Sequence, residues 1–176
     1  LGFGTEHMTE LAVGDAVEMI GPIGRGWQPP EGCKRALIVA GGVGSAPLYP
    51  LAEELTAAGV ATDAILGAST IDALVARERY GAVLGCEPAC STDDGTYGEK
   101  GLVTNKLQAL IDAGEQYDEV IAIGPVIMMK FVAATTKPYG IKTLVSLNPI
   151  MVDGTGMCGG CRVKVGGQMK FACVDG

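Results

Sequence analysis

The sequence is poor in aromatic residues and in histidine, and it contains neither a long apolar run nor a cluster of basic side chains. Aromatic residues make up 5% of the 176 positions, and His7 is the only histidine. No apolar stretch approaches the roughly 20 residues that a transmembrane helix requires. The net charge is −7, and no group of Lys and Arg residues offers a site for phosphates. We therefore expect neither nucleic acid nor a membrane among the partners.

The amino terminus, LGFGTEHMTE, has neither the basic nor the apolar region of a signal peptide. The six cysteines are grouped unevenly, which is typical of thiols in a reducing compartment rather than of a disulfide framework. We therefore expect a cytoplasmic protein. Because the sequence starts without methionine and stops within CVDG, we expect it to be part of a longer chain.

Three of the cysteines lie in the last 26 residues, MVDGTGMCGGCRVKVGGQMKFACVDG. Cys158, Cys161 and Cys173 form a C-x2-C-x11-C array, and Asp153 stands five positions before the first of them. The glycines between them allow the backbone to wrap closely around a cluster with positive φ angles. The array differs from the plant-type ferredoxin spacing in one position, where Asp153 replaces the first cysteine. The pattern predicts an iron–sulfur cluster with three thiolate ligands and one carboxylate ligand.

Two other interpretations of these cysteines remain open. A structural zinc site also uses Cys-x2-Cys, but it normally needs a fourth Cys or His ligand, and His7 lies at the far end of the chain. A disulfide is less consistent with the uneven grouping. Asp153 followed by Gly154 is also a common turn in which the aspartate side chain binds its own backbone.

Residues 33–147 alternate strand and helix patterns, which predicts a doubly wound parallel sheet of five or six strands in an α/β fold. Residues 36–40 (ALIVA) form a continuous apolar run, as expected for a strand that is buried on both faces. Further strands are predicted at 62–66, 119–124 and 143–147, and helices at 102–113 and 126–136. Residues 1–32 appear too short for a domain, and we predict β-structure there, with a turn at Gly14 and a strand over 16–20.

The glycine-rich turn GGVGSAP follows the predicted strand 36–40 directly. Gly41, Gly42 and Gly44 would let backbone N–H groups approach a pyrophosphate, and the helix that follows would add a partial positive charge. We expect Ser45 to cap this helix. Many such turns are rich in glycine for packing alone, but the position after a buried strand is the one that dinucleotide binding requires.

The motifs GPIG, GGVGSAPLYP, TDDGTYGEKG, IGPVIMMK and SLNPIMVDGTGMCGGCRV together resemble one family. The chain is similar to the small subunit of NADH-dependent reduced ferredoxin:NADP oxidoreductase and to the electron-transfer subunit of dihydroorotate dehydrogenase B. Both belong to the ferredoxin–NADP reductase superfamily. The resemblance implies an NAD(P)-binding domain, the end of an FAD-binding β-barrel and a small iron–sulfur segment, with the boundaries 33–147, 1–32 and 148–176.

The resemblance also implies site residues. Gly4 and Thr5 would contact FAD, although most of the barrel that holds this cofactor is expected to lie outside the sequence. The NAD(P) pyrophosphate would be held by Gly41, Gly42, Gly44, Ala46 and Pro47. The nicotinamide end would be bordered by Asp94, Gly95, Gly124, Pro125 and Met128. The cluster ligands of the family match Asp153, Cys158, Cys161 and Cys173.

Two classes of function follow from these patterns. In the first, an oxidoreductase subunit passes electrons between NAD(P)H, FAD and a 2Fe–2S cluster to a larger subunit with flavin and iron–sulfur clusters, and ferredoxin is an implied partner. In the second, a non-catalytic nucleotide-binding domain carries a cysteine tail that holds zinc or docks a partner. Where the family has Gly-Ala-Arg after the second strand, this chain has Gly67, Ala68 and Ser69. Loss of that arginine favours NADH over NADPH.

Overall fold

The computed structural model describes residues 2–27 and 31–175 and divides them into two compact units. The larger unit is Gly26–Ile150, and the smaller one combines Leu1–Arg25 with Met151–Gly176. The sequence-based boundaries 33–147 and 148–176 stay predictions, as does the range 1–32, in which residues 1 and 28–30 lie outside the described part. Among the described residues, no helix is both long enough and apolar enough to cross a membrane.

The larger unit is built around a six-stranded sheet in which every neighbouring pair of strands is parallel. The strand order is β4-β3-β2-β1-β5-β6, so the chain moves outward in one direction from β1 and then returns to add β5 and β6 on the other side. This confirms the predicted doubly wound fold. The strands are β1 (Arg35–Gly41), β2 (Ala61–Ala68), β3 (Ala89–Thr92), β4 (Glu99–Lys100), β5 (Glu119–Ile123) and β6 (Lys142–Val145).

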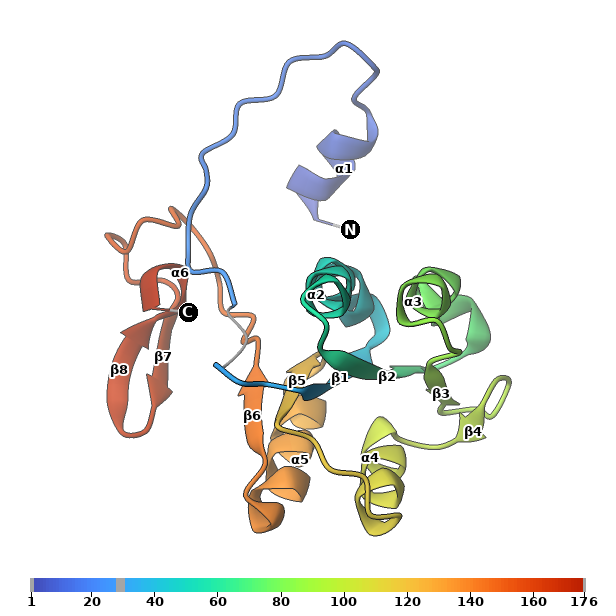
Figure 1. Cartoon of the computed structure of the whole chain (residues 1–176). Coiled ribbons are helices and arrows are strands. Elements are labelled where there is room, and N and C mark those ends of the chain that lie inside the picture. The colour runs from blue at the N-terminus through green and yellow to red at the C-terminus, as the bar shows by residue number, and fades with distance from the viewer. Residues whose placement is uncertain (1, 28–30, 176) are drawn as a thin grey trace. The chain divides into compact units, whose positions relative to one another are not determined.

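Helices cover both faces of this sheet (Figure 1). On one face α2 (Ser45–Ala57) and α3 (Arg77–Leu84) bury Ile38 of β1, and on the other α4 (Val103–Asp112) and α5 (Val126–Thr136) bury Leu37. Residues Ala36–Ala40 are all 0% exposed, which explains why their sequence is a continuous apolar run. Short 3₁₀ turns complete the unit at η1 (Gly42–Gly44), η2 (Ile71–Ala73) and η3 (Lys137–Tyr139).

Two expectations about local structure are wrong. Ser45 does not cap α2, because it is the first residue of the helix and its hydroxyl donates to the carbonyl of Gly42 at 2.9 Å. The strand expected over 16–20 does not form, and the described residues before β1 instead contain helix α1 (Phe3–Thr9). A strand needs a neighbour for its backbone groups, and no described segment pairs with residues 10–27. The turn at Gly14 is present, with φ 105° and a hydrogen bond from the Asp15 amide to Ala12.

The carboxyl-terminal part of the smaller unit is a two-stranded antiparallel hairpin. It pairs β7 (Arg162–Val165) with β8 (Gln168–Phe171) and ends in α6 (Ala172–Asp175). The two residues of its loop, Gly166 and Gly167, have φ values of 58° and 83°. Two consecutive positive φ angles are the geometry of the tight turn that joins twisted strands, and glycine adopts them without steric cost.

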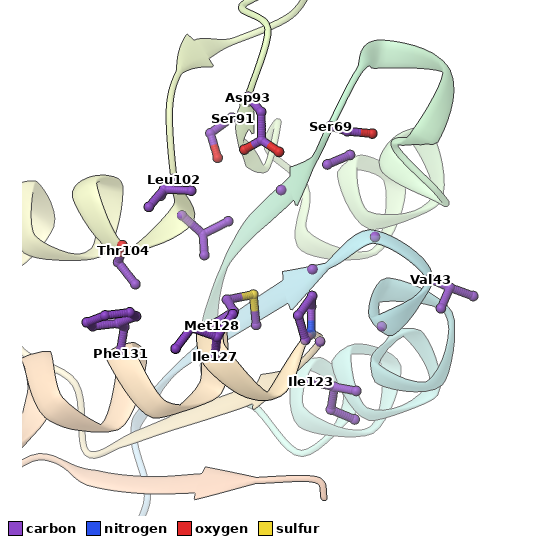
Figure 2. A pocket seen from close by; sticks show the side chains of 18 of the residues that line it. Val43, Ser69, Ser91, Asp93, Leu102, Thr104, Ile123, Ile127, Met128 and Phe131 are labelled. Atoms are coloured by element: carbon purple, nitrogen blue, oxygen red, sulfur yellow. The ribbon is translucent and has the colours of Figure 1, made fainter. Parts of the chain in front are cut away.

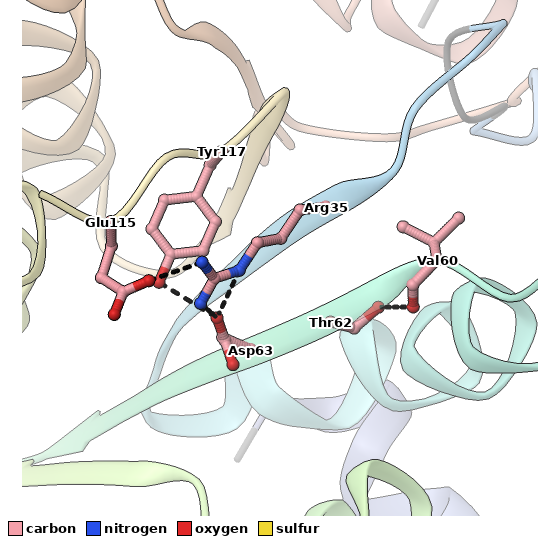
Figure 3. Close-up of polar contacts among 6 residues, drawn as sticks. All are labelled: Arg35, Val60, Thr62, Asp63, Glu115 and Tyr117. Carbon is pink, nitrogen blue, oxygen red and sulfur yellow. Dashed lines mark hydrogen bonds and ion pairs between the residues drawn. The ribbon is translucent and has the colours of Figure 1, made fainter.

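A network of polar side chains holds the amino ends of β1 and β2 together (Figure 3). The guanidinium of Arg35 donates to the carboxylate of Asp63 at 2.7 Å and to Glu115, and it lies 4.8 Å from the centre of the Tyr117 ring. The Tyr117 hydroxyl donates to Asp63 at 3.1 Å. Burial raises the pKa of Tyr117, and the negative charge of Asp63 adds to this effect. One cation therefore joins strands β1 and β2 to the segment that precedes β5.

We expect the substitution Arg35→Met to lower the free energy of unfolding by about 1–2 kcal/mol, because it removes a branched ion pair and a cation–π contact. The Arg35 side chain is 36% exposed, so solvent screening keeps the effect below that of a buried network. Lys106→Met is the control, since Lys106 makes a single ion pair, with the exposed Glu99, and lacks the branched pairing of Arg35, so the substitution should cost about 0.5 kcal/mol or less. Equal losses for the two variants in urea denaturation would contradict the predicted role of Arg35.

Candidate functional site

A cavity of about 980 Å³ lies at the carboxyl ends of β1, β2, β3 and β5. Its lining comes from the turns that follow these four strands, from the start of α4 and α5, and from Ser146–Asn148 after β6. Ligands of open parallel sheets bind at this edge, where the strand order reverses, and here the reversal falls between β1 and β5. The volume is within the range of small-molecule sites.

The middle of the cavity is formed by glycines that let the turns after β1 and β5 approach each other closely. A Cβ atom on Gly44 would lie 2.3 Å from the carbonyl oxygen of Ile123, and one on Gly124 would lie 2.7 Å from Cε of Met128. A Cβ atom on Gly41 would lie 2.6 Å from the sulfur of Met128. The η1 turn, whose three residues line the cavity, leads directly into the amino terminus of α2. This end of α2 suits an anionic group such as a pyrophosphate.

The two ends of the cavity differ in chemistry (Figure 2). The end formed by β2 and β3 carries polar side chains, Ser69, Ser91 and Asp93. The end formed by α5 carries Ile127, Met128 and Phe131, of which Ile127 is 58% and Phe131 52% exposed. A ligand that spans the cavity therefore meets hydrogen-bonding groups at one end and an open apolar surface at the other.

Most of the residues expected to bind NAD(P) line this cavity: Gly41, Gly42, Gly44, Pro47, Gly124, Pro125 and Met128. Ala46, Asp94 and Gly95 do not line it. Asp94 instead closes a turn, because its carboxylate accepts hydrogen bonds from the amide and the hydroxyl of Thr96 at 2.9 and 2.7 Å. The bond from the Thr96 amide is the main cause of the lowered pKa of Asp94. Gly4 and Thr5 lie in helix α1 of the smaller unit, are exposed and border no cavity described here.

The sequence patterns missed the polar end of the cavity. Ser91 and Asp93 belong to β3 and the residue after it, and the four-residue β3 (ACST) is too short and too polar to be recognised by hydrophobic alternation. The TDDG motif was the one available signal. It indicated the turn after β3, but the residue predicted from it was the second aspartate, Asp94, and the first, Asp93, lines the cavity. Ser69 and Phe131 were not expected in the site.

In the smaller unit, two of the four predicted cluster ligands lie in direct contact. The Sγ atoms of Cys161 and Cys173 are 3.2 Å apart, which is too long for a disulfide, and both residues are buried. Hydrogen bonding with Cys173 lowers the pKa of Cys161, and hydrogen bonding with Cys161 raises the pKa of Cys173, so the contact favours a thiolate at one of the two sulfurs. Cys158 is exposed, and its Sγ accepts a hydrogen bond from the Gly160 amide at 3.4 Å.

Asp153 organises the loop that carries these cysteines. Its two carboxylate oxygens accept hydrogen bonds from the amides of Thr155 and Cys158, each at 2.8 Å. The Thr155 amide is the main cause of the lowered pKa of Asp153. Within residues 2–27 and 31–175, no three side chains of His, Cys, Asp or Glu are gathered tightly enough to form a metal site. The donor set of three thiols and one carboxylate on a glycine-rich loop nevertheless fits an iron–sulfur cluster in kind.

Comparison with known proteins agrees with both parts of this description. Residues 148–176 match the family described as the iron–sulfur cluster binding domain of dihydroorotate dehydrogenase B. A solved structure of NADH-dependent reduced ferredoxin–NADP oxidoreductase aligns with all of this chain at 42% identity and a TM-score of 0.88, and 63% of that chain is covered.

Two curated relatives carry the name of the same electron transfer subunit. The dihydroorotate dehydrogenase B electron transfer subunit homolog of Thermotoga maritima is 43% identical over the whole of this chain, and 61% of its length is covered. The subunit from Clostridium acetobutylicum is 33% identical, also over the whole chain, and 68% of its length is covered. This chain belongs to the family of dihydroorotate dehydrogenase B electron transfer subunits.

Membership of the dihydroorotate dehydrogenase B electron transfer subunit family confirms the resemblance stated above, and the ferredoxin reductase-like arrangement of the sheet agrees with it. The chain spans less than two thirds of the Thermotoga maritima relative. The activity of the complete protein is therefore a proposal, and it rests on the cavity and on the cysteine segment.

Proposed function

We propose that this protein is an electron-transfer subunit that binds NAD(P)H in the cavity of the larger unit and a 2Fe–2S cluster in the smaller one. The observation that carries the proposal is the contact between Cys161 and Cys173, in a segment that matches an iron–sulfur domain, on the same chain as a dinucleotide-sized cavity. A subunit that holds both kinds of site can exchange electron pairs with a nucleotide and single electrons with a cluster.

In the nucleotide site, Gly41, Gly42 and Gly44 keep side chains away from the pyrophosphate, and the amino terminus of α2 adds a partial positive charge beside it. Gly124, Pro125 and Met128 border the nicotinamide. Pro47 lies in the first turn of α2, where its missing N–H costs no hydrogen bond of the helix. These roles rest on the lining of the cavity and on the family resemblance.

In the cluster site, Cys158, Cys161, Cys173 and Asp153 would be the ligands, and positive φ angles at Gly154, Gly156 and Gly159 shape the loop around them. The cluster would supply one-electron transfer, and FAD would accept hydride from the nicotinamide; this redox chemistry belongs to the cofactors. Gly4 and Thr5 lie in an exposed helix that forms no flavin site by itself, so FAD is proposed on family grounds alone.

The partner is proposed to be a larger subunit with flavin and iron–sulfur clusters, with NADH or NADPH as the small-molecule substrate and ferredoxin as a further redox partner. The ranges 1–32, 33–147 and 148–176 are proposed as the FAD-barrel end, the NAD(P)-binding domain and the cluster segment. A cytoplasmic location is proposed because the uneven grouping of the six cysteines is typical of a reducing compartment.

The protein, purified without exposure to air, is expected to be brown and to contain about two iron atoms and two sulfide ions per chain, as a 2Fe–2S cluster requires. Metal analysis, visible absorption and electron paramagnetic resonance after reduction provide the measurement. A colourless protein with about one zinc ion per chain would contradict the proposal and favour a structural metal site.

A further inference from the structure

The turn in the middle of the cavity has almost no side chains with which to hold its own position. It consists of Gly42, Val43 and Gly44, and Gly42 has φ +55°. The side chain of Val43 is directed to the surface, where the residue is 77% exposed. Glycine keeps more conformational freedom than any other residue. A turn of this composition therefore needs contacts from outside to present its backbone to a ligand in one geometry.

Ser45 holds the turn from the side of α2. Its amide and its hydroxyl both donate to the carbonyl of Gly42, the hydroxyl at 2.9 Å. Ser45 is 2% exposed and does not line the cavity. The position of the turn thus depends on where the first residue of α2 is fixed.

Tyr80 reaches this residue from the neighbouring helix α3, which lies beside α2 on the same face of the sheet (Figure 1). Among the residues of α3, Tyr80 is the one that is buried, at 0% exposed. Its hydroxyl donates to the carbonyl of Ser45 at 2.9 Å. Its ring packs edge-on against Tyr49 of α2, with 5.8 Å between the ring centres. The contact therefore joins α3 to the start of α2 in a direction set by both a ring and a hydrogen bond.

The surroundings of this hydrogen bond make it a firm connection. Burial raises the pKa of Tyr80, so the hydroxyl keeps its proton and can donate at neutral pH. Water does not compete for a buried donor, and a hydrogen bond in such surroundings is stronger than one at the surface. Tyr80 does not line the cavity, so any effect on a ligand has to pass through Ser45.

We propose that Tyr80 is a positioning residue for nucleotide binding, which through Ser45 holds the Gly42–Gly44 turn in the geometry that meets the pyrophosphate. The inference rests on the proposed nucleotide site and adds to it a residue that touches no nucleotide. A site that already has the bound geometry loses less conformational freedom on binding. Removal of the Tyr80 hydroxyl should therefore lower nucleotide affinity as well as stability.

The test measures the affinity of the full-length protein for NAD⁺ and NADP⁺ by calorimetry, because the oxidised nucleotides bind without electron transfer. Tyr80→Phe removes one oxygen atom and keeps the ring, and it should weaken binding of the preferred nucleotide by about three- to tenfold, the range of one hydrogen bond. Ser45→Ala breaks the same connection at its other end and should weaken binding in the same range. Because both changes act through one turn, their effects on affinity should be less than additive in the double variant.

Tyr117→Phe is the matched control. Tyr117 is also buried, at 7% exposed, and its hydroxyl donates to Asp63 at 3.1 Å, but it lies near the amino end of β5 and does not line the cavity. The two phenylalanine variants should lose similar amounts of stability in urea denaturation, since each loses one buried hydroxyl. Tyr117→Phe should leave nucleotide affinity unchanged, which separates a positioning role from a purely structural one.

Unchanged affinity in a folded Tyr80→Phe variant or in Ser45→Ala would overturn the role of Tyr80 and leave nucleotide binding intact. So would fully additive effects in the double variant, or an equal loss of affinity in Tyr117→Phe. Failure of wild-type protein to bind either nucleotide would overturn the proposed function itself, and the role of Tyr80 with it.

Discussion

Replacement of Gly44 by alanine is expected to lower the free energy of unfolding by about 3 kcal/mol, a large effect for the addition of one methyl group. The new Cβ would lie 2.3 Å from the carbonyl oxygen of Ile123 and 2.7 Å from its carbonyl carbon. Both atoms belong to the backbone at the end of β5, so relief requires the turns after β1 and β5 to separate. Nucleotide affinity should fall as well, since these turns form the middle of the cavity.

The matched control is Gly59→Ala. Gly59 follows α2 with φ +78°, and a Cβ there would meet no atom within 4 Å. The cost should be the conformational penalty alone, about 1 kcal/mol. Chemical denaturation of the two variants distinguishes the free-energy cost of steric crowding at Gly44 from the cost of an unfavourable backbone conformation at Gly59. A loss at Gly44 no greater than the loss at Gly59 would show that the β1 and β5 turns can move apart freely.

The substitution Cys161→Ser is expected to abolish the iron–sulfur cluster, with iron and sulfide content falling nearly to zero. Cys161 is buried against Cys173, so no other thiol can replace it without rearrangement of the hairpin. Cys33→Ser is the control, because Cys33 lies in the larger unit, where its sulfur donates a weak hydrogen bond to the carbonyl of Arg35 at 3.9 Å and packs against the core. Cys33→Ser should retain full iron content; retention of iron by Cys161→Ser would exclude this thiol as a ligand.

The same measurement separates the two roles of Asp153. Asp153→Asn keeps one oxygen that can accept the hydrogen bond from the Thr155 amide, but it loses the acceptor for the Cys158 amide and the negative charge that favours iron. If Asp153 is a ligand, both Asp153→Asn and Asp153→Ala should lose the cluster. If the side chain only closes the turn, asparagine should retain a cluster that alanine makes labile.

Sequence patterns were sufficient to predict the helices and strands that are long or have a strong hydrophobic pattern. The run 36–40 predicted a doubly buried strand, and the helix predicted over 126–136 has those bounds in α5 (Val126–Thr136). Strands β3 and β4 were missed, because they have four and two residues and lie at one edge of the sheet. A strand can be predicted from sequence only if it is long and apolar enough to show a pattern. These edge strands are short and polar.

The choice between Asp93 and Asp94 shows why site residues are harder to assign than elements. Neighbouring residues at the end of a strand point in opposite directions, so a motif can be placed at the right edge of the sheet without showing which of its side chains faces the cavity. Here Asp93 faces the cavity and Asp94 turns away to Thr96. Likewise, no local pattern in 16–20 reveals whether a neighbouring strand is available, and the described residues provide none.

Strand β1 begins in the Arg35 ion-pair network and ends at Gly41 in the nucleotide cavity, six residue steps or roughly 20 Å away. Mutations this far apart, with no shared contacts, usually have additive effects on free energy. Stabilising changes near Arg35 should therefore compensate for destabilising changes in the cavity without altering nucleotide choice. The sheet thus separates residues that can be varied for thermal robustness from residues that line the cavity.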